Sequence, residues 1–161
     1  MLFRSIDPVE LKRDLAPTFG ATHVSPSIEE AFALIQQETW GHMCDKVICA
    51  MGVGDGSMMD SILSLAAKRG RVVVTNIHPY HETAVTMNLM MLTIYEKQVV
   101  GSIFGSANIH SDIPKLLKLY RNGQLDLDSM ITNTYKLGDI NQGYQDMRDG
   151  KNIRGVLMYD R

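Results

Sequence analysis

Val47–Ser57 reads VICAMGVGDGS, a continuous apolar run followed by three glycines in the pattern Gly52-x-Gly54-x-Gly56. An uninterrupted apolar run is typical of a strand that is buried on both faces. The residues after the glycines have the apolar spacing of a helix, so the stretch predicts a strand, a glycine-rich turn and a helix in succession. Glycines at such a turn also allow the backbone to approach a phosphate group closely.

The glycine spacing argues against a phosphate-binding loop. The full pattern is G-x-G-x-x-G, with an acidic residue at the end of the next strand. This stretch is one residue short, and the next apolar run ends in Thr75-Asn76. We therefore interpret Gly52–Gly56 as a connection between a strand and a helix, and keep a nucleotide-binding enzyme built on this loop as an alternative.

Strands and helices alternate along the rest of the chain. Apolar, β-branched runs predict strands at Leu2–Ile6, Val47–Met51, Arg71–Ile77, Val99–Ser106, Met130–Tyr135 and Arg154–Asp160. Helical spacing predicts helices after Asp7 and Ser27, and at Asp60–Arg69, Met87–Tyr95, Ile113–Arg121 and Ile140–Gly150. This alternation predicts an α/β fold with a largely parallel sheet.

The composition is that of a globular chain. It has 161 residues, of which 45% are hydrophobic, so a sizeable core can form. Lys and Arg number 16 against 18 Asp and Glu, which gives no support to binding of nucleic acid or of a membrane surface. The apolar stretches are too short to span a bilayer, and no secretion signal is recognisable. Cys44 and Cys49 make no disulfide framework, so we expect a cytoplasmic protein.

Asp7 stands at the end of the first predicted strand and before a helix. It can cap that helix, with Pro8 at the first helical position and Glu10 closing a capping box. The ribose-binding acid of a dinucleotide-binding domain is expected at the same place, about 20 residues after its glycine loop. The two roles are compatible, and the second would put that loop before Met1.

Long stretches of the sequence resemble the medium-chain, zinc-type alcohol dehydrogenases. The similarity runs through IDPVELKRDLAPTFGATH, RGRVVVTNIHP, VGSIFGS and DIPKLLKLYRNGQLDLDSMITNTYKLGDINQGYQDMRDGKNIRGVL, and covers essentially the whole chain. Within that family the sequence is similar to the bacterial alcohol dehydrogenases that use nitrosodimethylaniline as acceptor. In that subgroup the nicotinamide cofactor is thought to stay tightly bound.

The resemblance implies an incomplete Rossmann-type parallel sheet followed by the C-terminal return segment of the catalytic domain. Residues 1–104 would be part of the dinucleotide-binding domain, and residues 105–161 would be the segment that packs on the catalytic domain in relatives. The strand order of such a sheet is 3-2-1-4-5-6, so the strand absent from this chain would lie in the middle. The open strand edges would be prone to pair with another chain.

The resemblance also implies a set of NAD-binding residues. Asp7 would accept hydrogen bonds from the adenosine-ribose hydroxyls and disfavour the 2′-phosphate of NADP, and Lys12 would reach the same ribose. Arg154 would pair with the pyrophosphate, for which a guanidinium group is well suited. The adenine side of the cleft would be lined by Ala50, Met51 and Gly52, and the nicotinamide side by Val74, Thr75, Asn76, Ser102 and Phe104.

The family transfers a hydride between an alcohol and the nicotinamide cofactor, with zinc lowering the pKa of the alcohol oxygen. Its zinc ligands belong to an N-terminal domain that this sequence does not include. Neither the His78-x-x-His81 pair nor Cys44 and Cys49 rebuilds a metal site. We therefore predict part of an NAD-dependent alcohol dehydrogenase with no catalytic residue and no metal ligand of its own, inactive by itself.

Two partners are expected from the resemblance. One is a separate N-terminal chain that complements this one, and the other is a second copy bound through the strand Val100–Ser106. A non-catalytic dimerisation or assembly module is therefore the alternative to a dehydrogenase part.

Overall fold

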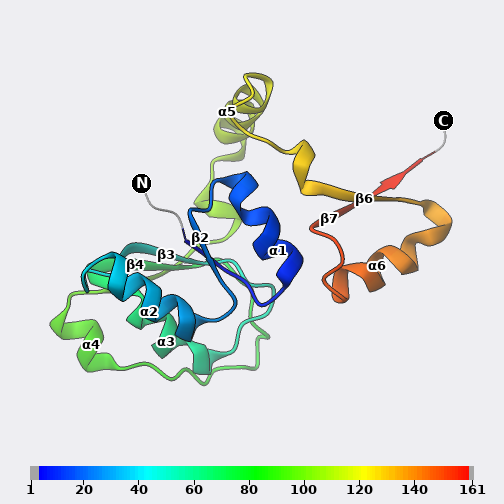
Figure 1. The fold of residues 1–161 in the computed structure, drawn as a ribbon. Coiled ribbons are helices and arrows are strands. Elements are labelled where there is room, and N and C mark those ends of the chain that lie inside the picture. The colour runs from blue at the N-terminus through cyan, green and yellow to red at the C-terminus, as the bar shows by residue number, and fades with distance from the viewer. Residues whose placement is uncertain (1–3, 160–161) are drawn as a thin grey trace. The chain divides into compact units, whose positions relative to one another are not determined.

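The computed structural model describes residues 4–159, which fall into two compact units (Figure 1). One unit comprises Ser27–Ala107, and the other joins the residues up to Pro26 with those from Asn108 onward. Leu2, Phe3 and Asp160, which the sequence places in strands, lie outside the described residues. The units group the chain differently from the domains 1–104 and 105–161, and that division stays a prediction.

The unit Ser27–Ala107 is built on a three-stranded parallel sheet. Its strand order is β3 (Cys44–Cys49), β4 (Ala66–Val74) and β5 (Gln98–Gly101). Three helices belong to this unit: α2 (Ile28–Glu38), α3 (Met59–Ser64) and α4 (Leu89–Ile94). In Figure 1, α2 and α3 lie side by side next to the β3–β4 pair.

The start of α2 follows directly from the sequence. Ser27 is extended, and its Oγ accepts a hydrogen bond of 3.2 Å from the N–H of Glu30, which satisfies a donor that the helix leaves open. Ala31 and Ile35 face inward one turn apart and are almost fully buried, so one apolar face covers the core.

The core of this unit lies between α3 and the sheet. Met59, Ile62 and Leu63 of α3 pack with Cys49, Ala66 and Val72. Val72 is completely buried at the centre of β4. Full burial of a side chain of this size stabilises the fold by about 1.5–3 kcal/mol. Of the predicted strand Val47–Met51 only Cys49 is buried, and Ile48 is 67% exposed, so the expectation that this run is buried on both faces is wrong.

The predicted helix Asp60–Arg69 is wrong in its second half, because α3 ends at Ser64 and β4 begins at Ala66. Cys44 pairs with Ala66 across the sheet, and the N–H of Cys44 donates to the carbonyl of Leu65 at 3.0 Å. Arg69 takes a left-handed backbone with φ of 61°, which no helix can continue through. Pairing with β3 therefore overrides the local helical spacing.

The predicted strand Val99–Ser106, which includes the proposed contact segment Val100–Ser106, is too long. β5 ends at Gly101, and Phe104–Ser106 form a short 3₁₀ turn. Phe104, Gly105 and Ser106 have φ of 47°, 67° and 53°, and this left-handed run is incompatible with an extended strand. Only Val100 and Gly101 of the predicted contact segment therefore belong to the strand.

The described part of the second unit contains two separate parallel pairs of strands. β1 (Arg4–Ile6) pairs with β2 (His23–Ser25), and β6 (Ile131–Lys136) pairs with β7 (Arg154–Met158). Its helices are α1 (Glu10–Leu15), α5 (Ile109–Arg121) and α6 (Ile140–Arg148). α5 begins four residues earlier than the sequence predicts, with Pro114 inside it.

The predicted α/β class with parallel strands is confirmed. Every strand pair in the described residues is parallel. The pair β1–β2 and the sheet β3–β4–β5 are hydrogen-bonded as separate sheets, with no ladder joining them within residues 4–159. This separation agrees with a Rossmann-type sheet that is incomplete between its second and fourth strands.

Candidate cofactor-binding site

The larger group of predicted cofactor-binding residues lies at the carboxyl ends of three adjacent strands. Ala50–Gly52 follow β3, Val74 ends β4, and Thr75 and Asn76 come directly after it. Ser102 follows β5, and Phe104 lies in the turn beyond it. Because the strands are parallel and adjacent, these residues share one edge of the sheet. That edge is where open α/β sheets bind their ligands.

Hydrogen bonds tie the three strand ends together. Thr75 donates to the carbonyl of Cys49 through its N–H at 3.1 Å and through its hydroxyl at 2.7 Å. The N–H of Ser102 donates to the carbonyl of Val74 at 2.9 Å. Thr75 therefore has a structural role, since it joins the ends of β3 and β4 through both its backbone and its side chain. These hydrogen bonds hold the carboxyl ends of β3, β4 and β5 in place without a ligand.

The turn at Phe104 is strained and exposed. Non-glycine residues in the left-handed region cost of order 1–3 kcal/mol each, and Phe104 and Ser106 both adopt it. The hydroxyl oxygens of Ser102 and Ser106 lie 3.0 Å apart and brace the turn. The Phe104 side chain remains 87% exposed. Strained backbone of this kind clusters at functional sites, so the turn agrees with the predicted role of Phe104, which stays a prediction.

The glycine loop is filled by protein, not open to a phosphate. A Cβ at Gly54 would lie 2.6 Å from Asn76 Nδ2 and 2.8 Å from His78 Cε1, and a Cβ at Gly56 would collide with the Ala84 carbonyl oxygen. Gly52 alone of the three faces open space, since a Cβ added there would meet nothing within 4 Å. The segment 76–85 therefore packs directly against Gly54 and Gly56, in the space beside these glycines that a phosphate would need.

Asn76 and His78 form a pair in that segment. Asn76 Nδ2 lies 2.7 Å from His78 Nε2, and Asn76 Oδ1 is buried without a partner in the described residues. The segment covers an apolar cavity of about 280 Å³, whose lining includes Val74, His78 and Val99. Between Gly54 and Gly56, the pKa of Asp55 is lowered because the Ser57 N–H donates to its carboxylate at 2.8 Å.

Asp7 is held at the carboxyl end of β1 by three contacts. Its N–H donates to the carbonyl of Ser25 at 3.1 Å, and its Oδ1 accepts from the N–H of Val9 at 2.9 Å. Lys12 Nζ lies 3.7 Å from Oδ2. The predicted capping box is wrong, because α1 begins only at Glu10 and Asp7 forms a turn with Val9 instead.

Sequence reasoning missed Arg13, which fixes the same turn. Its Nη1 donates to the carbonyl oxygens of Asp7 and Pro8, both at 2.8 Å. A cation six residues after the acid is a weak signal that could have indicated it. Asp7 is thus oriented through its backbone, while its partly exposed carboxylate keeps acceptor capacity for a ligand.

Arg154 opens β7 opposite Ile131. Its side chain is exposed and makes no ion pair or hydrogen bond with the residues that the structure describes. It borders a cavity of about 360 Å³ whose lining includes Tyr135, Tyr144 and Met147. Asp7, Lys12 and Arg154 therefore belong to one unit, and the other predicted contact residues belong to the other unit.

The described residues offer no evident metal centre. No three His, Cys, Asp or Glu side chains within residues 4–159 gather in a way that could hold a metal ion. Neither Cys44 nor Cys49 takes part in a disulfide, and burial raises the pKa of the Cys49 thiol. Within the same residues, no helix has the length and apolar character needed to cross a membrane.

The sequence profile of the zinc-binding dehydrogenases matches residues 5–122. The chain belongs to the zinc-binding dehydrogenase family. It is 52% identical over 155 residues to alcohol dehydrogenase B of Mycobacterium tuberculosis, covering 96% of this chain and 41% of that protein. It is 41% identical over 155 residues to the NDMA-dependent alcohol dehydrogenase of Amycolatopsis methanolica, covering 96% and 42%.

Solved structures show the same fold. Benzyl alcohol dehydrogenase from Acinetobacter calcoaceticus superimposes with a TM-score of 0.88 at 23% identity, over 99% of this chain and 43% of that one. The resemblance to medium-chain alcohol dehydrogenases is therefore confirmed. This zinc-binding dehydrogenase chain spans about two fifths of the length of the curated relatives that it matches.

Proposed function

We propose that this chain supplies cofactor-binding residues to an NAD-dependent alcohol dehydrogenase. The observation that supports this most directly is the gathering of Ala50–Gly52, Val74–Asn76, Ser102 and Phe104 at the carboxyl ends of three adjacent parallel strands. The relatives are named alcohol dehydrogenases, which favours an alcohol as the second substrate.

Asp7 would select NAD over NADP. Its carboxylate is 28% exposed, and Lys12 lies too far from Oδ2, at 3.7 Å, for a hydrogen bond. Oxygen lone pairs are therefore available to the two ribose hydroxyls. A 2′-phosphate at the same place would meet a negative charge, and Lys12 would offset that repulsion only in part.

The residues present fit NAD. Gly52 leaves open space beside the strand end, and Arg154 is an unpaired cation among the described residues, suited to a pyrophosphate. Val74, Thr75 and Asn76, together with Ser102 and Phe104, would border the nicotinamide. When bound, the nicotinamide exchanges a hydride with the alcohol. The role of these residues is to orient that ring, since Thr75 and Ser102 are themselves fixed by hydrogen bonds to neighbouring strands.

The described residues do not fit a zinc ion, so we derive no step through zinc from this chain. Polarising an alcohol oxygen needs a Lewis acid or a general base near the nicotinamide. We propose that another polypeptide segment supplies it, and that the 161-residue chain is inactive alone. Two cysteines outside any disulfide favour a reducing compartment such as the cytoplasm.

Titration calorimetry with NAD tests the cofactor role. Asp7→Asn should weaken NAD binding about 10- to 100-fold, the loss expected for hydrogen bonds to a charged acceptor. It should also narrow the preference for NAD over NADP. Asp14→Asn is the matched control, because it makes the same charge change on an exposed face of α1. A chain that binds no NAD, or an Asp7→Asn variant that binds it unchanged, contradicts the proposal.

A second proposal is that the chain acts as a non-catalytic dimerisation or assembly module that binds a second copy of itself. The free edge of β5 favours it. All four residues of this edge strand are exposed, including Val99 and Val100. An exposed apolar edge is a template for pairing with another strand.

A further inference from the structure

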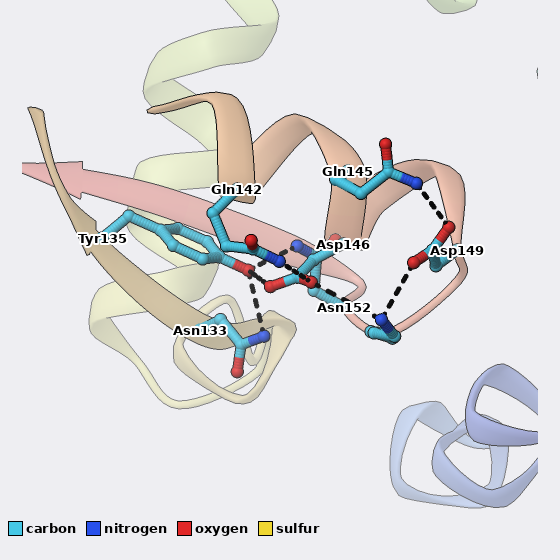
Figure 2. A network of polar contacts seen from close by, with 8 residues as sticks. Asn133, Tyr135, Gln142, Gln145, Asp146, Asp149 and Asn152 are labelled. Atoms are coloured by element: carbon cyan, nitrogen blue, oxygen red, sulfur yellow. Dashed lines mark hydrogen bonds and ion pairs between the residues drawn. The ribbon is translucent and has the colours of Figure 1, made fainter. Parts of the chain in front are cut away.

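Tyr135 on β6 is the centre of a polar network that joins β6, α6 and the loop before β7 (Figure 2). Its hydroxyl donates to Asp146 Oδ2 on α6 at 2.9 Å. It accepts hydrogen bonds from Asn133 Nδ2 at 3.1 Å and from Asn152 Nδ2 at 3.0 Å. A hydroxyl has one donor and two acceptor positions, so Tyr135 uses its whole capacity.

Asp146 fixes the direction of that network. Its side chain is only 15% exposed, and Oδ1 accepts from Gln142 Nε2 at 2.8 Å, with Lys151 Nζ 4.0 Å away. A carboxylate accepts hydrogen bonds only, so the Tyr135 hydroxyl must point its proton at Asp146. Its lone pairs are then left for the amide groups of Asn133 and Asn152.

The Tyr135 ring is also locked by its shape. A Cβ at Gly155 would lie 2.7 Å from Tyr135 Cε2, and one at Gly143 would lie 3.3 Å from Cδ2. Both glycines therefore lie against the Cδ2–Cε2 edge of the ring, where a side chain at Gly155 would clash with it and one at Gly143 would be tightly packed. Nothing in the sequence indicates this arrangement, since a tyrosine in a polar strand has no characteristic pattern.

The network holds the residues on both sides of Arg154. Asn152 is 4% exposed and bonded to Tyr135, and the N–H of Ile153 donates to Thr132 Oγ1 at 2.9 Å. Gly155 is packed against the Tyr135 ring. Arg154 lies between these fixed points with an exposed guanidinium that has no partner among the described residues. A fixed backbone carrying an open cation is the arrangement expected of a preorganised anion-binding residue.

We propose that Tyr135 and Asp146 are positioning residues that hold Arg154 for the pyrophosphate of the cofactor. The inference rests on the proposed function, in which Arg154 meets that pyrophosphate. Tyr135 and Asp146 make no contact with the ligand. They act through Asn152 and Gly155, so their loss raises the cost of ordering Arg154 when the anion binds.

Amide hydrogen exchange tests the positioning without any cofactor. Tyr135→Phe should speed exchange at Ile153 and Gly155 by roughly 5- to 10-fold, the effect of losing about one hydrogen bond. Tyr144→Phe is the matched control, because Tyr144 borders the same cavity from α6 and is 55% exposed. Asn152→Ala is a second variant, for use if Tyr135→Phe fails to fold. It removes the hydrogen bond between Asn152 and Tyr135, together with a buried oxygen that has no partner among the described residues. Unchanged exchange in both variants overturns the proposal.

Ligand binding tests the consequence. Tyr135→Phe should lower the affinity for NAD by roughly 3- to 10-fold and leave the affinity for adenosine unchanged. In a chain that already carries Arg154→Gln, the Tyr135→Phe substitution should cause no further loss of NAD affinity. An equal loss for adenosine, or an undiminished effect without Arg154, overturns the positioning role. If the unsubstituted chain binds no NAD, the proposed function and the pyrophosphate role both fall, and the exchange rates alone decide whether Tyr135 holds Arg154.

Discussion

Gly56 shows how a single missing side chain admits a whole segment. Its Cβ position is occupied by the Ala84 carbonyl oxygen, whereas the Cβ position of Gly52 is open. Gly56→Ala should therefore destabilise the fold by about 1–3 kcal/mol, the cost of overpacking a buried position. Gly52→Ala should change stability by no more than about 1 kcal/mol, in either direction.

Urea unfolding of the two alanine variants provides the measurement. The pair is closely matched, since both glycines lie in the same loop and neither has a left-handed backbone. Equal unfolding midpoints for Gly56→Ala and the unsubstituted chain would show that the segment 76–85 is not packed on the loop as the structure has it.

Lys97 is a buried cation whose lowered pKa makes the stability of the fold depend on pH. It is 8% exposed, and its Nζ donates to the Leu63 carbonyl in the last turn of α3 at 2.8 Å. Burial lowers the pKa of Lys97 from its ordinary 10.5, and the nearby Asp60 offsets part of this shift. Between the lowered pKa and 10.5 the unfolded chain binds the extra proton, so stability from this group rises as the pH rises.

Lys97→Met should remove that pH dependence. The unfolding free energy of the unsubstituted chain should rise more between about pH 7 and pH 10 than that of the variant. Lys68→Met is a suitable control, because Lys68 and Lys97 both lie over the Tyr95 ring, at 5.4 Å and 5.8 Å from its centre, but Lys68 is exposed. Identical pH profiles for the Lys97 variant and the unsubstituted chain would mean that Lys97 is not buried as a cation.

At single residues, sequence reasoning predicts a residue's place along an element better than it predicts the contacts that the residue makes. It places Asp7 correctly at the end of a strand, because Pro8 has no N–H with which a strand could continue its ladder. The capping role is wrong, since Val9 takes up Oδ1 before the helix begins. The filling of Gly54 by Asn76 and of Gly56 by Ala84 could not be predicted, because it depends on a segment more than twenty residues away.

At the scale of elements, local signals predict α2 well and α3 poorly. Ser27 and Glu30 form a cap whose energy is entirely local, so sequence reasoning locates it. The boundary between α3 and β4 depends instead on the pairing of Cys44 with Ala66, a contact between distant residues. Periodicity cannot detect such pairing, and the apolar residues Leu65 and Ala66 suit either a helix or a buried strand.

The β5 edge offers a test of self-association at the same scale. The Ser102 N–H points to β4, so alternation along the strand directs the Val99 N–H to the free edge. Val99→Pro removes that donor while leaving the bonds to β4 in place, and it should convert a dimer to a monomer. Val99→Ala keeps the N–H and should remain dimeric. Light scattering after size exclusion decides, and a monomeric unsubstituted chain contradicts the proposed dimer.

At the scale of the whole molecule, residues 4–159 present exposed apolar surface and unpaired buried polar atoms where another polypeptide could bind. No residue of α5 is buried, and Ile109, Ile113, Leu116 and Leu117 are between 48% and 58% exposed. Arg4 on β1 keeps Nε and Nη2 away from solvent with no acceptor among the described residues. A buried donor without a partner costs about 1–3 kcal/mol or more, which another polypeptide segment could recover.

Co-expression tests whether such a segment completes an enzyme. The part of the M. tuberculosis alcohol dehydrogenase B that this chain does not match, when produced with it as a separate polypeptide, should co-purify and give alcohol-dependent NAD reduction. Neither polypeptide should do so alone. Removing metal with a chelator should abolish the activity, since the family description names zinc.

Two variants separate assembly from cofactor binding in that pair. Ile113→Asp with Leu117→Asp puts charges one turn apart on α5 and should prevent co-purification, because the carboxylates would be desolvated at the contact. Asp7→Asn should leave co-purification intact and raise the KM for NAD about 10- to 100-fold. A pair that co-purifies without reducing NAD would support the assembly module and contradict the dehydrogenase. If the pair keeps its activity with both aspartates on α5, this helix does not contact the co-expressed polypeptide.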